Sequence, residues 1–128
     1  DSNLTIDCRL VEVSQVLLNL LNNSKDAIDK FSNRWIRISA QGIGNDVEIE
    51  VIDCGNGIPP EVQAKLFTPF FTTKDIGKGT GLGLGISKKI IENHGGTISI
   101  DHDSPNTRFV IRLPRHQAHE SVQQKAAV

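Results

Sequence analysis

The sequence predicts an α+β fold, a two-layer sandwich in which a mixed or antiparallel sheet carries about three helices on one face. Segments with apolar residues at every third or fourth position are interspersed with shorter segments that alternate apolar and polar residues, in the order α-β-β-α-α-β-β. The chain has 128 residues, of which 38% are apolar and 23% charged. These values are typical of one soluble domain with its own core.

Three helices are expected. The first covers about residues 9–30 with Asp7 as its N-cap, residues 59–61 (Pro-Pro-Glu) begin a short second helix, and the third covers residues 84–94 and is closed by Gly-Gly at 95–96. The long first helix has a spacing that predicts one buried face, formed by Leu10, Val13, Leu17, Leu20, Leu21, Ser24 and Ile28.

Four strands are expected from the alternating pattern. They lie at residues 35–40, 46–53, 97–100 and 107–113, with a turn at 42–45, and residues 3–6 have a short strand-like pattern as well. The sequence becomes polar and rich in Gln and Ala after Pro114. We therefore expect one domain at residues 1–114 and a disordered tail at 115–128.

Composition excludes several functional classes. The net charge of −1 gives no electrostatic reason to expect nucleic acid or an anionic membrane as the main partner. The sequence has neither an apolar run of membrane-spanning length nor a signal-peptide pattern. Cys8 and Cys54 lack metal-ligand spacing, so reduced thiols in a cytoplasmic domain are expected rather than a disulfide.

The glycine run at residues 77–85 is the most informative feature of the sequence. Five glycines alternate with Lys78, Thr80, Leu82 and Leu84, directly before the third helix. Glycine lets several backbone N–H groups turn toward one anion, and the start of the helix adds a partial positive charge. The spacing fits neither a Walker loop nor a dinucleotide-binding fingerprint. We interpret the run as a phosphate-binding segment rather than a flexible linker, which is usually rich in Gly and Ser.

The glycine run belongs to a long irregular stretch at residues 67–83, a length typical of a functional lid. Phe67, Phe70 and Phe71 are expected to pack against the domain at the base of this lid, a role that core packing alone also explains. Lys74 and Lys78 are placed to contact phosphate oxygens.

Asn19, Asn23 and Asp26 fall on one stripe of the first helix. Amide and carboxylate oxygens suit Mg²⁺ and the orientation of a phosphate chain. For a helix in isolation, a solvated polar face explains the stripe as well.

Asp53 ends an apolar strand and is followed by Gly55 and Gly57. A carboxylate in this position can accept a hydrogen bond from the exocyclic amine of adenine, while the glycines let a flat ring approach the backbone. The alternative is an Asp that only forms the turn.

Four segments together resemble the N, G1, F and G2 boxes of the catalytic ATP-binding domain of sensor histidine kinases, in the family's order and spacing. These segments cover residues 19–27, 53–57, 67–74 and 77–85, and the resemblance extends over about residues 4–114. It implies the Bergerat ATP-binding fold, shared with gyrase, the Hsp90 chaperones and the MutL repair proteins. It also implies ATP and Mg²⁺ as cofactors.

The resemblance assigns roles to particular positions. Asn23 matches the asparagine that coordinates Mg²⁺, Asn19 its partner one turn earlier, and Asp53 the aspartate that recognises the adenine amino group. Thr107 matches a water-bridged adenine contact, although Asn106 stands where a glycine is common. The predicted catalytic residues are Asn19, Asn23 and Lys74, with Asn23 as the metal ligand. The predicted nucleotide-contacting residues are Asp26, Asp53, Gly55, Gly57, Lys78, Gly79, Thr80, Gly81, Leu82, Gly83, Leu84 and Thr107.

Asn19 favours phosphotransfer over hydrolysis. Hydrolytic relatives typically have a Glu here as the base that activates water, and an amide cannot take up that proton. The rival hypotheses are an ATP-hydrolysing relative, a serine kinase of the anti-sigma type and a non-catalytic nucleotide sensor.

The expected partners follow from the same resemblance. None of the four histidines lies in a long amphipathic helix beside an acidic residue, as a phosphoacceptor would. We therefore expect a separate phosphoacceptor hairpin upstream in the same kinase, and a response regulator downstream. The isolated domain is expected to be a monomer and its parent a homodimer.

Overall fold

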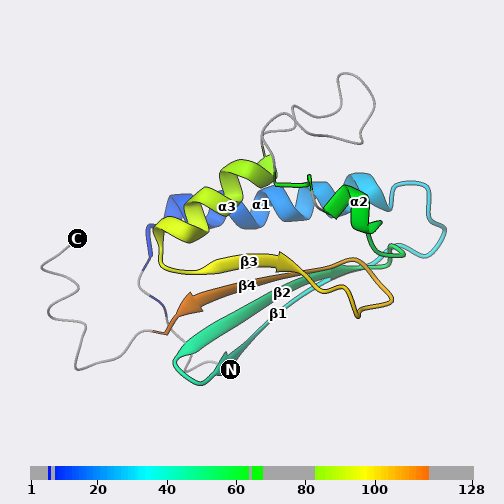
Figure 1. Ribbon diagram of the computed structural model, residues 1–128. Helices are drawn as coiled ribbons and strands as arrows, with labels where there is room; N and C mark the ends of the chain where they lie inside the picture. Colours follow the sequence, from blue (N-terminus) through cyan, green and yellow to red (C-terminus); the bar gives the residue numbers. More distant parts are fainter. Residues whose placement is uncertain (1–5, 7, 64, 68–82, 116–128) are drawn as a thin grey trace, which may run out of the picture.

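The computed structural model describes residues 6, 8–63, 65–67 and 83–115. The predictions for residues 3–5, for Phe70, Phe71, Lys74 and Lys78, and for the tail beyond residue 115 concern residues outside this description. Helices lie over one face of a four-stranded sheet (Figure 1), as the sequence predicts. The elements are α1 (Leu10–Ala27), β1 (Ile36–Ile43), β2 (Asp46–Asp53), α2 (Pro60–Gln63), α3 (Gly83–Asn93), β3 (Thr97–Ile100) and β4 (Arg108–Pro114).

The sheet has the strand order β1-β2-β4-β3, and each neighbouring pair is antiparallel. Of the two predicted sheet types, the antiparallel one is therefore correct for the described strands. The pairing of β2 with β4 runs from Asp46 opposite Pro114 to Ile52 opposite Arg108. Asp53 thus lies at the end of a central strand, next to the residue that precedes β4.

The core lies between the helices and the inner face of the sheet. The most deeply buried residues come from α1, α3 and the two central strands, and include Val16, Leu20, Val51, Ile91, Phe109 and Ile111. The predicted buried face of α1 is largely confirmed, since Val13, Leu20, Ser24 and Ile28 are buried. Val16 is fully buried as well, although it was not included in that face. No helix of the described residues is long and apolar enough to cross a membrane.

The N-terminal end of α1 differs from the prediction. The N-cap is Arg9, in extended conformation and with no side-chain cap, so the assignment to Asp7 is wrong. The Arg9 backbone N–H donates to Nε2 of His94 (3.1 Å), while Nδ1 of His94 lies 2.8 Å from the Ile90 carbonyl oxygen. The imidazole therefore joins the start of α1 to the end of α3. Because this contact spans 85 residues, no local capping rule could have predicted it.

An ion-pair network covers the outer face of the sheet. Arg108 on β4 contacts Glu50 (2.6 Å) and Glu48 (3.3 Å) on β2, and also Asp101 (3.0 Å). The hydrogen bond from Arg108 holds the pKa of the Glu50 carboxyl below its ordinary value. Because the folded pKa lies below the unfolded one, Glu50 stabilises the fold above the unfolded pKa, and this contribution is lost as the pH falls through the folded pKa.

Glu50→Gln is therefore expected to lower the free energy of unfolding by about 1 kcal/mol near neutral pH. The deficit relative to the unmodified chain should shrink as the pH falls through the lowered pKa of the Glu50 carboxyl, because the carboxyl then becomes protonated and the ion pair is lost in the unmodified chain as well. Urea unfolding at several pH values measures both effects, with the exposed Glu92→Gln as control. A deficit that is the same at pH 3 and pH 7 would contradict this account.

Candidate functional site

The ends of β2 and β4 meet at a backbone junction that contains three of the predicted site residues. The Asp53 N–H donates to the Thr107 carbonyl oxygen (3.0 Å), and the Thr107 N–H donates to the Gly55 carbonyl oxygen (3.2 Å). These bonds continue the β2–β4 ladder past the last paired residues. The predicted base-recognition residues, which lie far apart in the sequence, are therefore brought together by strand pairing.

Asp53 is buried, with 1% of its surface exposed. Its Oδ1 accepts a hydrogen bond from the Gly55 N–H (2.7 Å), which is the turn that the sequence suggested. Its Oδ2 is buried and has no hydrogen-bond partner among the described residues. A buried carboxylate oxygen without a donor is costly, so it is normally satisfied by a ligand or by water. Asp53 thus forms the turn with one oxygen and leaves the other for a donor from outside.

Gly55 and Gly57 are required for different reasons. A Cβ on Gly55 would lie 2.7 Å from Asp53 Oδ1 and 2.8 Å from Thr107 Oγ1, so no side chain fits there. Gly57 has φ +89°, which L side chains rarely adopt, and its N–H donates to Thr107 Oγ1 (3.1 Å). The two glycines, Asp53 and the buried Thr107 therefore form one closely packed unit.

Asn106 also belongs to this unit, because its Nδ2 donates to the Gly55 carbonyl oxygen (3.2 Å). The sequence analysis recorded Asn106 only as a departure from the family pattern. In the structure, its side chain holds the same backbone segment that Asp53 and Thr107 hold. The presence of Asn106 where the family commonly has a glycine is the signal in the sequence that could have identified this residue.

The second part of the predicted site lies on α1. Asn19 is half-buried, and its Nδ2 donates to Oγ of Ser87 on α3 (3.1 Å). Asn23 is also half-buried, whereas Asp26 is exposed. Because the start of α1 contacts His94 and Asn19 contacts Ser87, the two helices run antiparallel, and the start of α3 lies toward Asn23. Sequence reasoning missed Ser87.

The described residues include only part of the predicted phosphate-binding segment. α3 begins at Gly83, one residue before the predicted start, so Gly83 and Leu84 belong to its first turn. Lys74, Lys78, Gly79, Thr80, Gly81 and Leu82 lie outside the described residues. The predicted ligand contacts of these residues remain predictions.

The donor chemistry near Asn23 fits a magnesium ion that is shared with a phosphate. Among the described residues, no group of three or more His, Cys, Asp or Glu could hold a metal alone. An amide oxygen from Asn23 is a hard ligand of the kind that Mg²⁺ accepts, but it needs phosphate and water oxygens to complete the coordination. The site therefore fits a metal that arrives with a nucleotide.

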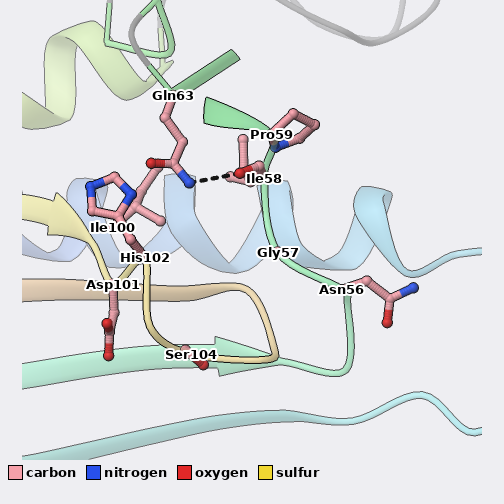
Figure 2. A pocket seen from close by; sticks show the side chains of 9 residues that line it. All are labelled: Asn56, Gly57, Ile58, Pro59, Gln63, Ile100, Asp101, His102 and Ser104. Atoms are coloured by element: carbon pink, nitrogen blue, oxygen red, sulfur yellow. Dashed lines mark hydrogen bonds between the residues drawn. The ribbon is translucent and has the colours of Figure 1, made fainter. Parts of the chain in front are cut away.

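A separate hollow of about 400 Å³ lies beside the segment that follows Gly55 (Figure 2). Among the predicted site residues, only Gly57 lines it. Asp53, Thr107 and the asparagines of α1 do not. Its lining residues are Asn56, Gly57, Ile58, Pro59, Gln63, Ile100, Asp101, His102 and Ser104. This hollow therefore adjoins the junction through Gly57, but Asp53 and Thr107 do not line it.

Comparison with known proteins gives a consistent family. Residues 9–117 match the family described as histidine kinase-, DNA gyrase B-, and HSP90-like ATPase. The chain is 39% identical over 108 residues to the two-component sensor PprA of Pseudomonas aeruginosa, covering 80% of this chain and 12% of that protein. It is 41% identical over 103 residues to the sensor histidine kinase ZraS of Escherichia coli K12, covering 80% of this chain and 21% of that protein.

Solved structures agree with this result. The catalytic domain of the histidine kinase ThkA has a TM-score of 0.77 at 36% identity, covering 90% of this chain and 75% of that one. Full-length ShkA in complex with AMPPNP has a TM-score of 0.67 at 26% identity, covering 84% of this chain and 22% of that one.

The chain spans only 12% and 21% of the lengths of these two curated relatives. The match nevertheless covers most of this chain, and the predicted fold and motifs agree with it. The chain belongs to the histidine kinase-, DNA gyrase B- and HSP90-like ATPase family, as a catalytic ATP-binding domain of the sensor histidine kinase type.

Proposed function

We propose that this domain binds Mg-ATP and delivers the γ-phosphate to a histidine on a separate phosphoacceptor domain in two-component signalling. The observation that carries the proposal is the buried Oδ2 of Asp53, which has no partner among the described residues. An acceptor fixed at the end of a strand is suited to the exocyclic amine of adenine. Guanine has a carbonyl oxygen at that position, which would face the carboxylate unfavourably.

The second part of the proposal concerns the phosphates. Asn23 is the proposed magnesium ligand, and the start of α3 lies toward Asn23, beyond the contact between Asn19 and Ser87. When bound, Mg²⁺ neutralises phosphate charge. The first turn of α3 supplies backbone N–H groups and the positive end of a helix dipole. Lys74 and Lys78 are proposed to contact the phosphates from the lid.

The third part is phosphotransfer rather than hydrolysis. Asn19 is an amide, so it cannot act as the base that activates water. A phosphoacceptor hairpin of the same kinase is the proposed source of the attacking imidazole, and a response regulator is the proposed downstream partner. We propose a cytoplasmic domain in a homodimeric parent, because its relatives include two-component sensors.

Asp53→Asn tests base recognition. The carboxylate has two oxygens, one for the Gly55 N–H and one for a ligand, whereas an amide has only one. We expect the affinity for ATP to fall about 10- to 100-fold, since one donor is left unsatisfied. The affinity for purine riboside triphosphate, which lacks the exocyclic amine, should change much less. Isothermal titration measures both, with the exposed Asp103→Asn as control, and equal losses for both nucleotides would remove Asp53 from base recognition.

Asn23→Ala tests the metal assignment. ATP affinity is measured with Mg²⁺ and with a chelator, and the gain on adding Mg²⁺ should fall by about tenfold in the variant because a coordinating oxygen is lost. Asn22→Ala is the matched control, since Asn22 is the exposed neighbour on the same helix. If Mg²⁺ increases the ATP affinity of Asn23→Ala as much as that of the unmodified domain, Asn23 is not the metal ligand.

Phosphotransfer is tested by joining this domain to the phosphoacceptor hairpin of its parent and supplying ATP labelled at the γ-phosphate. We expect an acid-labile phosphohistidine on the hairpin, and phosphate release by the domain alone at least about 100-fold slower than transfer, because no base activates water. Steady phosphate release by the domain alone would instead favour an ATP-hydrolysing relative. Nucleotide binding without any phosphohistidine would favour a nucleotide sensor.

A further inference from the structure

We propose that Ser87 is a positioning residue for Asn19: it holds the Asn19 amide with its nitrogen toward α3, so that Asn19 serves the phosphate chain as an N–H donor. The metal is then left to Asn23. This inference rests on the proposed function. It adds Ser87 to the site and assigns different roles to Asn19 and Asn23.

Two hydrogen bonds show how the Asn19 amide is oriented. Its Nδ2 donates to Oγ of Ser87 at 3.1 Å, and its Oδ1 accepts from Nε2 of Gln15, one helical turn earlier, at 3.0 Å. The oxygen is therefore directed along α1 and the nitrogen across to α3. The amide therefore presents its N–H side, not its oxygen, toward α3, and an N–H group suits a phosphate oxygen rather than a metal ion.

The location of Ser87 makes it an effective anchor. Its side chain is fully buried, and it lies in the second turn of α3, four residues after Gly83. Because α3 begins at Gly83, within the glycine run, Ser87 connects the proposed phosphate-binding end of this helix to α1, which carries the asparagines. The Asn19–Ser87 bond is thus placed to set the spacing between the two elements that are proposed to hold the phosphates.

Ser24 on α1 provides a matched comparison. It is also a buried serine, but its Oγ has no hydrogen-bond partner among the described residues. Removing the Ser24 hydroxyl therefore leaves no donor unsatisfied, whereas removing the Ser87 hydroxyl leaves an Asn19 N–H without its acceptor. Ser24→Ala and Ser87→Ala delete the same atom from the same helical layer with different consequences.

The experiment measures the affinities for Mg-ATP and for AMP, which lacks the β- and γ-phosphates, in both variants. Ser87→Ala should weaken Mg-ATP binding about tenfold and leave AMP binding within about twofold. Ser24→Ala should change neither. In an Asn19→Ala background, Ser87→Ala should have no further effect on Mg-ATP, because the amide that it positions is gone.

Equal losses for Mg-ATP and AMP in Ser87→Ala would show a merely structural role and overturn the proposal. The proposal would also be overturned if Ser87→Ala weakened Mg-ATP binding as much in the Asn19→Ala background as in the unmodified domain. It would be overturned as well if Ser24→Ala and Ser87→Ala weakened Mg-ATP binding equally. These outcomes would leave the proposed function intact as long as the unmodified domain binds Mg-ATP and Asp53→Asn weakens that binding. Failure of the unmodified domain to bind Mg-ATP would overturn both proposals.

Discussion

The pairing of β2 with β4 is the constraint on which the position of Asp53 and its neighbouring glycines depends. Backbone hydrogen bonds join Asp53 to Thr107 and Thr107 to Gly55, and side-chain bonds from Asp53 and Thr107 close around the glycines. Since a Cβ on Gly55 would collide with both acceptors, the unit tolerates little change. The position of one buried carboxylate oxygen is therefore set by the pairing of the two central strands, not by a loop.

The helix layer contributes a second, separately built part of the site. Asn19 meets Ser87 across the α1–α3 contact, while the core residues Leu20 and Ile91 are fully buried in the same layer. Burial of apolar side chains holds the helices on the sheet, and the polar pair sets how one helix faces the other. The part proposed to recognise the base and the helix part are thus held by different forces, with strand pairing acting in the first and helix packing in the second.

Much of the fold could be predicted because it depends on local patterns. The seven elements, their order and most of the buried face of α1 follow from the spacing of apolar residues. The contacts of His94, Ser87 and Asn106 could not, because their partners lie 85, 68 and 51 residues away. The residues proposed to recognise the base follow from their motif, but only the structure shows that Asp53 uses one oxygen for its turn and has another without a partner among the described residues.

The imidazole between Arg9 and Ile90 has a mechanical consequence for the helix layer. It fastens the first residues of α1 to the last turn of α3, at the end of the helix pair opposite the glycine run. Two helices that are held together at one end change their separation at the other end by changing the angle between their axes. A shift of the α3 start relative to α1 would therefore be an angular movement about the His94 end, larger at Gly83 than at Ser87 and smallest at the histidine.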